Sequence, residues 1–421
     1  MERPIANRTL SEKKLSRSFW YLCAFFVFTL LFMLFQGGKL AVMLFIFSLV
    51  FCVYVYLGRY SGIRKTSGTR TFHNMHGQIQ LEAGQSLESE LIMFIPGFWP
   101  VPYVRVKESL VRRNGEGVVQ EGTFVPDWAR RGVVKFSSPP LRRGVYSFDR
   151  TELKTVDVFG IFEHKGEVEL PYSLIVFPKT TELGYWTHFQ QLMKGIEHHT
   201  VSTLAHRETT QINGVREYMY GDRLSRIHWN ATAKTGTWKS KEFERESLPI
   251  TVVVLDRWQK SYTSTEEFEL AVSVTASLLK YGAHQQLPFG LLSAGGNGKY
   301  YPSKVKSDHY QQMSQHLVEV ESDGWQSMEQ TLGHYAKEWK RGTLFVFVSP
   351  RKNQELLTEM KHLEAQGMYA CHILIDAKSV PTKAISSEEW VNQLRRSGLL
   401  AYAISNLEAL PNALGGAKLH G

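Results

Sequence analysis

An apolar run, Ile250-Thr251-Val252-Val253-Val254-Leu255-Asp256, indicates how the C-terminal part of the chain folds. It is rich in β-branched residues, and it does not alternate polar with apolar residues as a strand with one wet face would. Two pairs with capping-box spacing follow it and predict the start of a helix: Thr263 with Glu266, and Ser264 with Glu267. A strand buried on both faces and followed directly by a helix is typical of a parallel sheet.

The alternation of strands and helices continues after this run. Further apolar runs predict strands at Phe289–Leu292, Thr343–Val348, Tyr369–Ile375 and Leu399–Ile404. Helical spacing separates them around Met313–Val318, Met328–Trp339 and Asn353–Ala365. We therefore expect residues 250–421 to form an α/β domain with a doubly wound parallel sheet.

Residues 58–180 show a different pattern. Short segments alternate polar and apolar residues and are separated by Gly and Pro, which predicts antiparallel strands and turns. The clearest segments are Gly77–Glu82, Ser89–Phe94, Tyr103–Val106, Gly132–Phe136, Gly144–Leu153 and Ser173–Phe177. Since no long helical pattern interrupts them, a β-sandwich-like domain is the predicted fold.

Two uncharged runs precede the β domain. Phe19–Phe35 and Leu40–Leu57 are rich in Phe, Leu and Val, and each is about long enough to cross a bilayer. The link Gln36-Gly37-Gly38-Lys39 is so short that two helices joined by it must be antiparallel. A cleaved signal peptide is the alternative, but the first run is long for one and lacks a small-residue cleavage pattern. Residues 19–57 are thus predicted to form a transmembrane helical hairpin after a basic N-terminal segment, 1–18.

Basic residues predict how this hairpin lies in the membrane. They flank both outer ends, at Arg3, Arg8, Lys13, Lys14 and Arg17 before the first run and Arg59, Arg64, Lys65 and Arg70 after the second. The tip carries only Lys39. Because cytoplasmic flanks hold the excess of Lys and Arg, we expect a cell-membrane protein with both termini in the cytoplasm.

Charge and cysteine content agree with that location. The formal net charge is +9, but a good share of it comes from the membrane flanks, where basic residues attract anionic lipid. Basic residues elsewhere are interleaved with acids and form no known nucleic-acid reader, so no nucleic-acid partner is expected. The three cysteines offer no paired framework in the soluble part, which fits a reducing compartment.

Residues 181–249 are polar and irregular and are predicted to be a long ordered connection. Within them, residues 214–234, here called the signature segment, crowd acids, bases and aromatics together. The candidate docking or structural residues are Arg216, Glu217, Tyr218, Gly221, Asp222, Arg226, His228, Trp229, Thr232 and Lys234.

Two interpretations of the signature segment are open. Arg216, Arg226 and Lys234 could bind an anion, while Asp222 and His228 exchange protons. Alternatively, the charged residues form an ion-pair and hydrogen-bond network that fixes the segment or docks a partner. The second is favoured, because no nucleophile–base pair with an orienting third group can be named.

The spacing Gly214-x-Arg216-Glu217-Tyr218-x-x-Gly221-Asp222, continued by Arg226 and His228-Trp229-x-x-Thr232-Ala233-Lys234, resembles the signature of the bacterial domain of unknown function 58 family. Two upstream elements fit as well: Arg143-Gly144-Val145-Tyr146 and Asp157-Val158-Phe159-Gly160-Ile161-Phe162. The resemblance implies a membrane-anchored protein with a von Willebrand factor A-like C-terminal domain. It also implies a MoxR-type AAA+ ATPase and a transglutaminase-like membrane protein as partners, and no established catalytic activity.

The implied A-like domain would have lost its metal site. Metal-binding A domains place Asp-x-Ser-x-Ser after the first strand, whose oxygens bind Mg²⁺. Here Asp256 survives, but Trp258 cannot coordinate and Lys260 would repel a cation. We therefore expect no bound metal or other cofactor, with Asp256 instead accepting hydrogen bonds or pairing with a cation at the carboxyl edge of the sheet.

Two other motifs have simpler interpretations. Gly295-Gly296-Asn297-Gly298 lacks the lysine of a phosphate-binding loop, so a hairpin turn is predicted. His198, His199 and His206 could suggest zinc, but adjacent histidines converge poorly on one ion and no cysteine is near, so a solvated loop is favoured.

The sequence as a whole favours a non-enzymatic scaffold or adaptor at the inner face of the membrane. The anchor, the signature segment and the eroded metal site support that expectation. The alternative is an enzyme that acts on an anionic or envelope-linked substrate through Asp222, His228 and Lys234.

Overall fold

The computed structural model describes residues 17–72, 81–115, 117–160, 163–187, 189–190, 206–219, 224, 227–247, 250–296, 298–305, 307–376 and 386–415. The chain divides into two compact units, residues 1–176 and residues 177–421. The basic N-terminal segment before Arg17 lies outside the described residues. Each unit is described by itself below.

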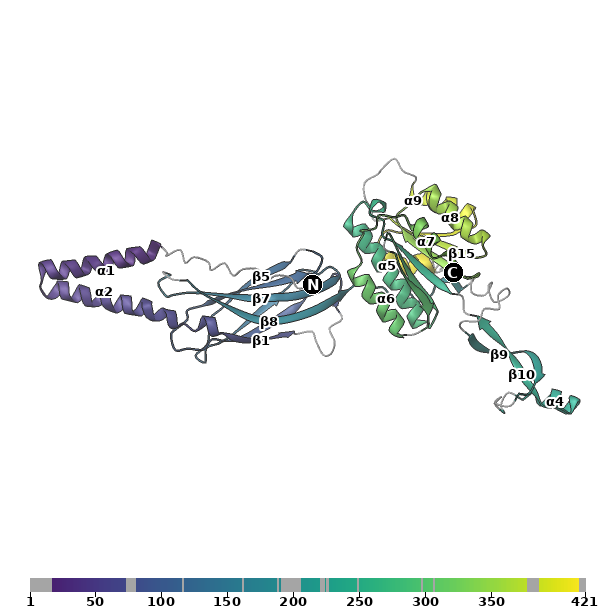
Figure 1. Ribbon diagram of the computed structural model, residues 1–421, viewed down its shortest axis with the longest axis horizontal. Helices are drawn as coiled ribbons and strands as arrows, with labels where there is room; N and C mark the ends of the chain where they lie inside the picture. The colour runs from purple at the N-terminus through teal and green to yellow at the C-terminus, as the bar shows by residue number, and fades with distance from the viewer. Residues whose placement is uncertain are drawn as a thin grey trace, which may run out of the picture. The chain divides into compact units, whose positions relative to one another are not determined.

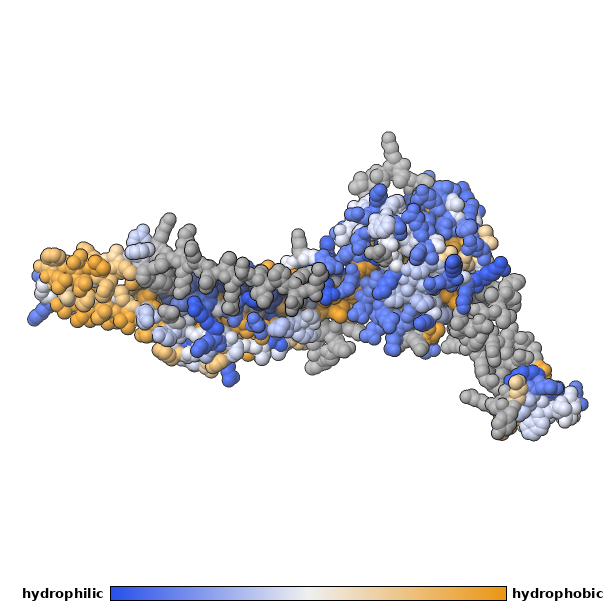
Figure 2. All heavy atoms as spheres, in the orientation of Figure 1, coloured by the Kyte–Doolittle hydropathy of each residue, from blue (hydrophilic) through white to orange (hydrophobic). Residues whose placement is uncertain are grey.

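Two apolar helices begin the first unit. They are α1, Arg17–Gln36, and α2, Lys39–Leu57, and they are joined by Gly37 and Gly38, both with positive φ. The helices pack against each other, for instance through Phe26 and Phe45, whose ring centroids are 5.6 Å apart. Figure 2 shows their outer surface as hydrophobic. Within the described part of the chain, α2 is long and apolar enough to span a bilayer, while the apolar stretch of α1, Trp20–Gln36, is shorter.

Eight strands form two antiparallel sheets after the helices, as a β-sandwich-like domain requires (Figure 1). One sheet has the order β1-β3-β6 and the other β2-β8-β7-β4-β5. The strands are β1 Ser67–Phe72, β2 Leu81–Glu82, β3 Glu88–Phe94, β4 Val104–Arg112, β5 Val118–Phe124, β6 Arg131–Ser137, β7 Gly144–Val156 and β8 Glu163–Phe177. Short 3-10 turns, Gly58–Tyr60 and Ile63–Lys65, connect α2 to β1.

Side chains from both sheets share one core. Leu91 and Met93 of β3 pack with Val104 and Val106 of β4, and all four are buried. An ion pair also crosses between the sheets, because Arg70 of β1 donates to the carboxylate of Glu108 on β4. The two sheets therefore face each other across an apolar layer that contains one buried charge pair.

A six-stranded sheet forms the centre of the second unit. Its order is β13-β12-β11-β14-β15-β16, with β11 Thr251–Asp256, β12 Phe289–Ala294, β13 Lys299–Lys304, β14 Leu344–Ser349, β15 Tyr369–Ile375 and β16 Leu400–Ile404. Five strands run parallel, as predicted. At one edge the predicted parallel sheet is extended by β13, which pairs with β12 in antiparallel fashion, so the sheet is mixed. Gly295 and Gly296, both with positive φ, begin the predicted hairpin turn that reverses the chain there.

Helices cover both faces of this sheet (Figure 1). Val253 and Leu255 of β11 belong to one apolar cluster and Val252 and Val254 to another, so alternate side chains of one strand enter two cores. The helices are α5 Thr265–His284, α6 Ser307–Glu319, α7 Met328–His334, α8 Gln354–Ala365, α9 Ser387–Arg396 and α10 Leu410–Gly415. Ser264 caps α5, since its side chain accepts from the N–H of Glu267. The result is a three-layer α/β/α domain with a mixed sheet.

The connection before β11 is more regular than its sequence suggests. Trp186 and Phe189 are buried in the core of the α/β domain. Further along, β9 His206–Glu217 and β10 Lys239–Ser247 form an antiparallel pair, and the short helix α4, Trp229–Thr235, lies between them in the chain. We call β9, α4 and β10 the arm. The expectation of an irregular connection is wrong for these residues, because paired strands satisfy their backbone hydrogen bonds.

Candidate functional site

The arm carries most of the signature residues and is the first candidate site. Arg216 and Glu217 end β9, while His228, Trp229, Thr232 and Lys234 lie at or within α4. Gly221, Asp222 and Arg226 lie outside the described residues, as do His198 and His199 of the proposed histidine loop. The structure thus brings the two described ends of the signature segment onto one small substructure.

Hydrogen bonds from signature side chains hold α4 on β10. His228 Nδ1 accepts from the backbone N–H of Ala231 at 3.1 Å, which caps the helix. Thr232 Oγ1 accepts from the backbone N–H of Lys239 at 3.0 Å. Because these acceptors are already used within the arm, both residues act here as structural groups.

Glu217 completes the network from β9. Its Oε1 lies 3.2 Å from Nζ of Lys239, directly across the strand pair. Arg216 Nη1 donates to the carbonyl of Glu217 at 3.0 Å. At the described residues, these contacts are those of an ion-pair and hydrogen-bond network. The acid–base interpretation depends on Asp222, which lies outside the described residues.

Aromatic side chains form the exposed part of the arm. The ring centroids of Trp229 and Trp238 are 6.2 Å apart, and Tyr218 lies 5.7 Å from Trp238. Trp229 is 63% exposed and Trp238 is 53% exposed. We call Trp229 and Trp238 the tryptophan face. The polar signature residues hold the described part of the arm together, and the tryptophan face is a large apolar surface exposed on it.

The second candidate site lies where the strand order of the α/β sheet reverses. Strand β11 has β12 on one side and β14 on the other, so Asp256 and Ser349 end neighbouring strands at this switch point. Ligands of open α/β sheets bind at such an edge. Asp256 is fully buried, and its two carboxylate oxygens accept from the Trp258 N–H at 2.9 Å and the Ser349 hydroxyl at 2.8 Å. Both oxygens of the Asp256 carboxylate are thus used by donors of the protein itself.

The surroundings of Asp256 are unsuited to a cation. Burial raises the pKa of the Asp256 carboxyl, against the lowering effect of these hydrogen bonds and of Arg351. Arg351 is held by Glu329 at 2.8 Å and Glu355 at 3.1 Å, and its guanidinium lies 5.1 Å from the Trp258 ring centroid. Within the described parts of the chain, no three His, Cys, Asp or Glu side chains are placed to hold a metal ion.

Magnesium is therefore expected to leave the melting temperature of the α/β domain unchanged. A ligand that binds only the native state would raise it. The measurement is a thermal melt of the full chain in detergent with and without Mg²⁺. A Mg²⁺-dependent rise that Asp256→Asn abolishes would show that the site binds metal after all.

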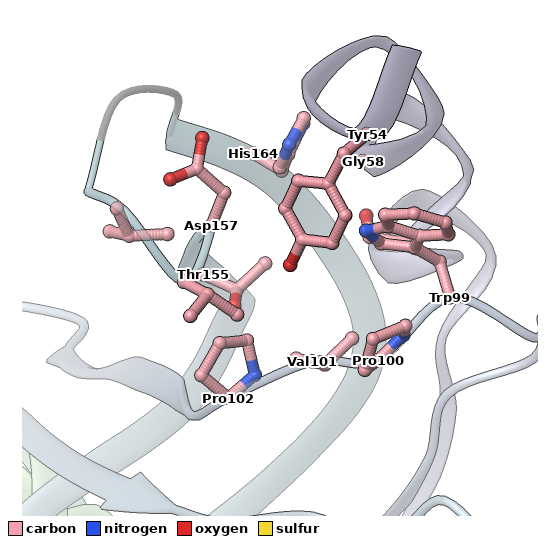
Figure 3. Close-up of a pocket in the computed structure, with 12 residues that line it drawn as sticks. Tyr54, Gly58, Trp99, Pro100, Val101, Pro102, Thr155, Asp157 and His164 are labelled. Carbon is pink, nitrogen blue, oxygen red and sulfur yellow. The ribbon is translucent and has the colours of Figure 1, made fainter. Parts of the chain in front are cut away.

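The third candidate site is a small cavity in the first unit, between the end of α2 and the β domain (Figure 3). Tyr54 and Trp99 line one side, and Asp157 and His164 line the other. It leaves room for one water molecule at most. Burial lowers the pKa of His164, although Asp157 counteracts it, and His164 Nε2 is buried without a hydrogen-bond partner in the structure. The cavity is thus a packing junction rather than a substrate pocket.

Sequence reasoning missed several residues of these sites. Trp238 and Lys239 were not singled out, although a strand beginning just after Gly236 would have placed them opposite the end of β9. Ser349 carries no acidic group and gave no sequence signal of its own, yet its hydroxyl donates to Asp256. Trp99 had no local signal at all, because its contact with Tyr54 joins distant parts of the sequence.

Comparison with known proteins gives a family match that overlaps the first two candidate sites. Residues 214–373 match a family described as "Protein of unknown function DUF58". The chain is also 25% identical over 309 residues to "Uncharacterized protein YeaD" of Bacillus subtilis (strain 168), an alignment that covers 72% of this chain and 74% of that protein. The matched range begins in the arm and includes Asp256 and Ser349.

Solved structures add little to this. Proximal thread matrix protein 1 from the mussel byssus aligns with 40% of this chain at 11% identity and a TM-score of 0.28. The alignment spans 45% of that protein, less than half of its length. A likeness this distant carries no argument about fold or function.

Proposed function

We propose, from the premise that this chain belongs to the DUF58 family, that it is a membrane-anchored scaffold whose arm docks a protein partner. The tryptophan face is the observation that carries the proposal. Trp229 and Trp238 are both more than half exposed, and they sit side by side on a substructure held by its own hydrogen bonds. Tryptophan is enriched among the residues that dominate binding energy at protein interfaces.

The anchor of the proposed scaffold is the helix pair α1 and α2. A helix of 19 residues from Lys39 to Leu57, which is uncharged after Lys39, supports a membrane span, and the antiparallel packing of α1 on α2 supports a second. The basic residues on both outer flanks favour cytoplasmic termini. In this arrangement the arm and the α/β domain meet cytoplasmic partners.

The α/β domain is proposed to be a von Willebrand factor A-like domain that has lost its metal. The order of its central strands and the position of Asp256 at the end of the first of them support this. So does the use of both Asp256 oxygens by protein donors. Such a domain would contribute shape and surface to the scaffold rather than a metal-dependent contact.

The proposed partner is a MoxR-type AAA+ ATPase, in a system that also includes a transglutaminase-like membrane protein and serves the cell envelope. The resemblance of the signature segment to its family supports this choice of partner. The geometry supports only the docking role of the arm. Catalysis through Asp222, His228 and Lys234 is the less favoured function, because His228 Nδ1 and Thr232 Oγ1 are used inside the arm.

Replacing the tryptophan face should weaken partner binding. We expect Trp229→Ser or Trp238→Ser to raise the Kd for the ATPase at least about tenfold, since a hot-spot residue contributes roughly 2 kcal/mol or more. The measurement is binding of the purified ATPase to the full chain in lipid nanodiscs. Trp325→Ser is the matched control, because Trp325 is 69% exposed on the α/β domain. Equal loss in all three variants would contradict docking by the arm.

His228→Asn separates docking from catalysis. Asn caps helices about as well as the best residues, so α4 should persist and the ATPase should still bind. The matched readout is complementation of a strain that lacks this chain. If His228→Asn keeps binding but abolishes function, the scaffold-only proposal fails and an acid–base role for His228 gains support.

A further inference from the structure

Exposed apolar side chains gather at one end of the β domain, where it meets α2. Val158 and Phe159 lie in the turn after β7 and are 60% and 56% exposed. Phe98, in the loop after β3, is 74% exposed. Loops and turns of soluble domains carry polar residues, because water must satisfy their backbone. Apolar tips on two separate loops at the same end therefore need a partner.

The β7–β8 turn lies alongside α2 rather than beyond its end. The ring of Phe159 is 4.9 Å from that of Phe51 and 5.5 Å from that of Tyr54. Phe51 precedes the last residue of α2, Leu57, by six positions, which is about 9 Å along a helix axis. The tip of the turn thus reaches the level of the uncharged part of the helix.

Aromatic residues mark where the edge of a bilayer would lie. Trp99 packs on Tyr54 with ring centroids 4.9 Å apart, and Tyr56 and Tyr60 are exposed nearby in the chain. Tyrosine and tryptophan are enriched at the membrane–water interface, where one end of the ring is wet. Phe51 lies about one helical turn to the hydrocarbon side of Tyr54. Phe159 contacts both rings and so lies at the level between them.

Residues 157–160 can enter a layer poor in water because two of their backbone N–H groups are satisfied within the turn. The N–H of Phe159 donates to Oδ1 of Asp157 at 3.0 Å, and the N–H of Gly160 donates to the Asp157 carbonyl at 2.9 Å. Gly160 has a φ of 68°, which closes the turn. Unsatisfied backbone groups are what usually keep irregular loops out of the membrane.

We infer that residues 157–160 of the β7–β8 turn, with Val158 and Phe159 at the tip and Phe98 beside it, are an interfacial wedge that inserts into the anionic lipid leaflet next to α2. The inference rests on the proposed membrane anchor. Arg64 and Lys65, exposed directly after α2, supply the positive charge that anionic headgroups attract. The wedge gives the β domain a second attachment to the bilayer and fixes its tilt against the helix.

Lipid quenching of a fluorophore tests the wedge. Phe159→Cys is introduced into a chain that carries Cys23→Ala and Cys52→Ala. Cys371 is fully buried and is left in place, so the new cysteine is the one that the dye labels. The cysteine is labelled with an environment-sensitive dye, and the full chain is reconstituted into vesicles of phosphatidylcholine and phosphatidylserine that carry a shallow nitroxide lipid. We expect a blue-shifted dye that loses most of its emission to the quencher.

Two reference positions make the result decisive. Val119→Cys lies on β5, where residue 119 is paired with Ser109 of β4. Ser109 is five residues, or about 17 Å, from the membrane-proximal start of β4. A dye at position 119 should therefore stay unquenched. Val50→Cys is exposed on α2 and reports the anchor itself. Quenching at 50 and 159 but not at 119 supports the wedge. Quenching at 50 alone overturns the wedge and keeps the anchor, whereas no quenching at 50 overturns the anchor and the wedge together.

Discussion

Glu108→Ala is expected to lower the free energy of unfolding of the first unit by about 3 to 5 kcal/mol, because it leaves a buried charge without its partner. The Arg70 side chain is only 4% exposed and that of Glu108 only 2%. Arg70 would keep its contact with the Leu170 carbonyl and its position 3.8 Å from the Phe148 ring centroid. Neither contact neutralises a guanidinium that links two sheets.

An exposed pair on the same domain provides the control. Arg150 and Glu167 are 3.4 Å apart, with side chains 63% and 61% exposed, and Glu167→Ala should cost no more than about 1 kcal/mol. The measurement is proteolysis of the full chain in detergent across a urea gradient, which distinguishes the two units by fragment size. Similar losses for Glu108→Ala and Glu167→Ala would mean that the buried pair is not a structural link between the sheets.

Lowering the pH from 6.5 toward 4 is expected to destabilise the α/β domain, with His372 as a main cause. His372 is fully buried on β15; its Nδ1 lies 3.1 Å from Trp390 Nε1 and its Nε2 lies 3.2 Å from the Ser349 carbonyl. Trp390 can only donate, so Nδ1 must accept and the ring must be neutral. Burial lowers the pKa of His372 from 6.5 to about 4, against the raising effect of the Ser349 carbonyl.

The direction in which pH changes the free energy of unfolding follows from proton binding. Above pH 6.5 the imidazole is neutral in both states, so this contribution to stability is fully present. Between pH 6.5 and about 4 the unfolded chain binds a proton at His372 that the native state does not bind. The free energy of unfolding therefore falls by up to about 3 kcal/mol. His316, whose pKa burial also lowers to about 4, adds to the same slope.

A non-titrating replacement checks this assignment. His372→Gln can accept from Trp390 and donate to Ser349, so it should flatten the dependence of the free energy of unfolding on pH, leaving the part due to His316. His334→Gln, at an exposed position on α7, should keep the full slope. Urea unfolding of the α/β domain at a series of pH values is the measurement. An unchanged slope in His372→Gln would place the acid sensitivity elsewhere.

Elements with a strong local pattern could be predicted from the sequence. The run Ile250–Asp256 matches β11, Thr251–Asp256. A short run rich in β-branched residues and buried on both faces favours a strand over a helix. Edge elements were harder. Strand β13, Lys299–Lys304, contains Pro302 and polar residues, which an exposed edge tolerates. Helix α9 was missed although Ser386 and Glu389 form a capping box that the sequence already displays.

Contacts between distant residues could not be predicted in the same way. Arg70 and Glu108 are 38 positions apart, and nothing in either strand alone indicates that they meet. In the arm, Glu217 pairs with Lys239, but the partners of His228 and Thr232 are backbone groups. The spacing of side chains does not show which of them bind backbone groups. The sequence therefore could not distinguish a capping role of His228 from a catalytic one.

Site-specific photocrosslinking from the arm tests the proposed scaffold most directly. A photoreactive phenylalanine analogue at Trp229, in cells that also carry the AAA+ ATPase proposed as the partner, should give a membrane-bound adduct that contains the ATPase. The same analogue at Trp325, equally exposed on the α/β domain, should give none. An ATPase adduct from position 325 but not from position 229, or from neither, would contradict docking by the arm.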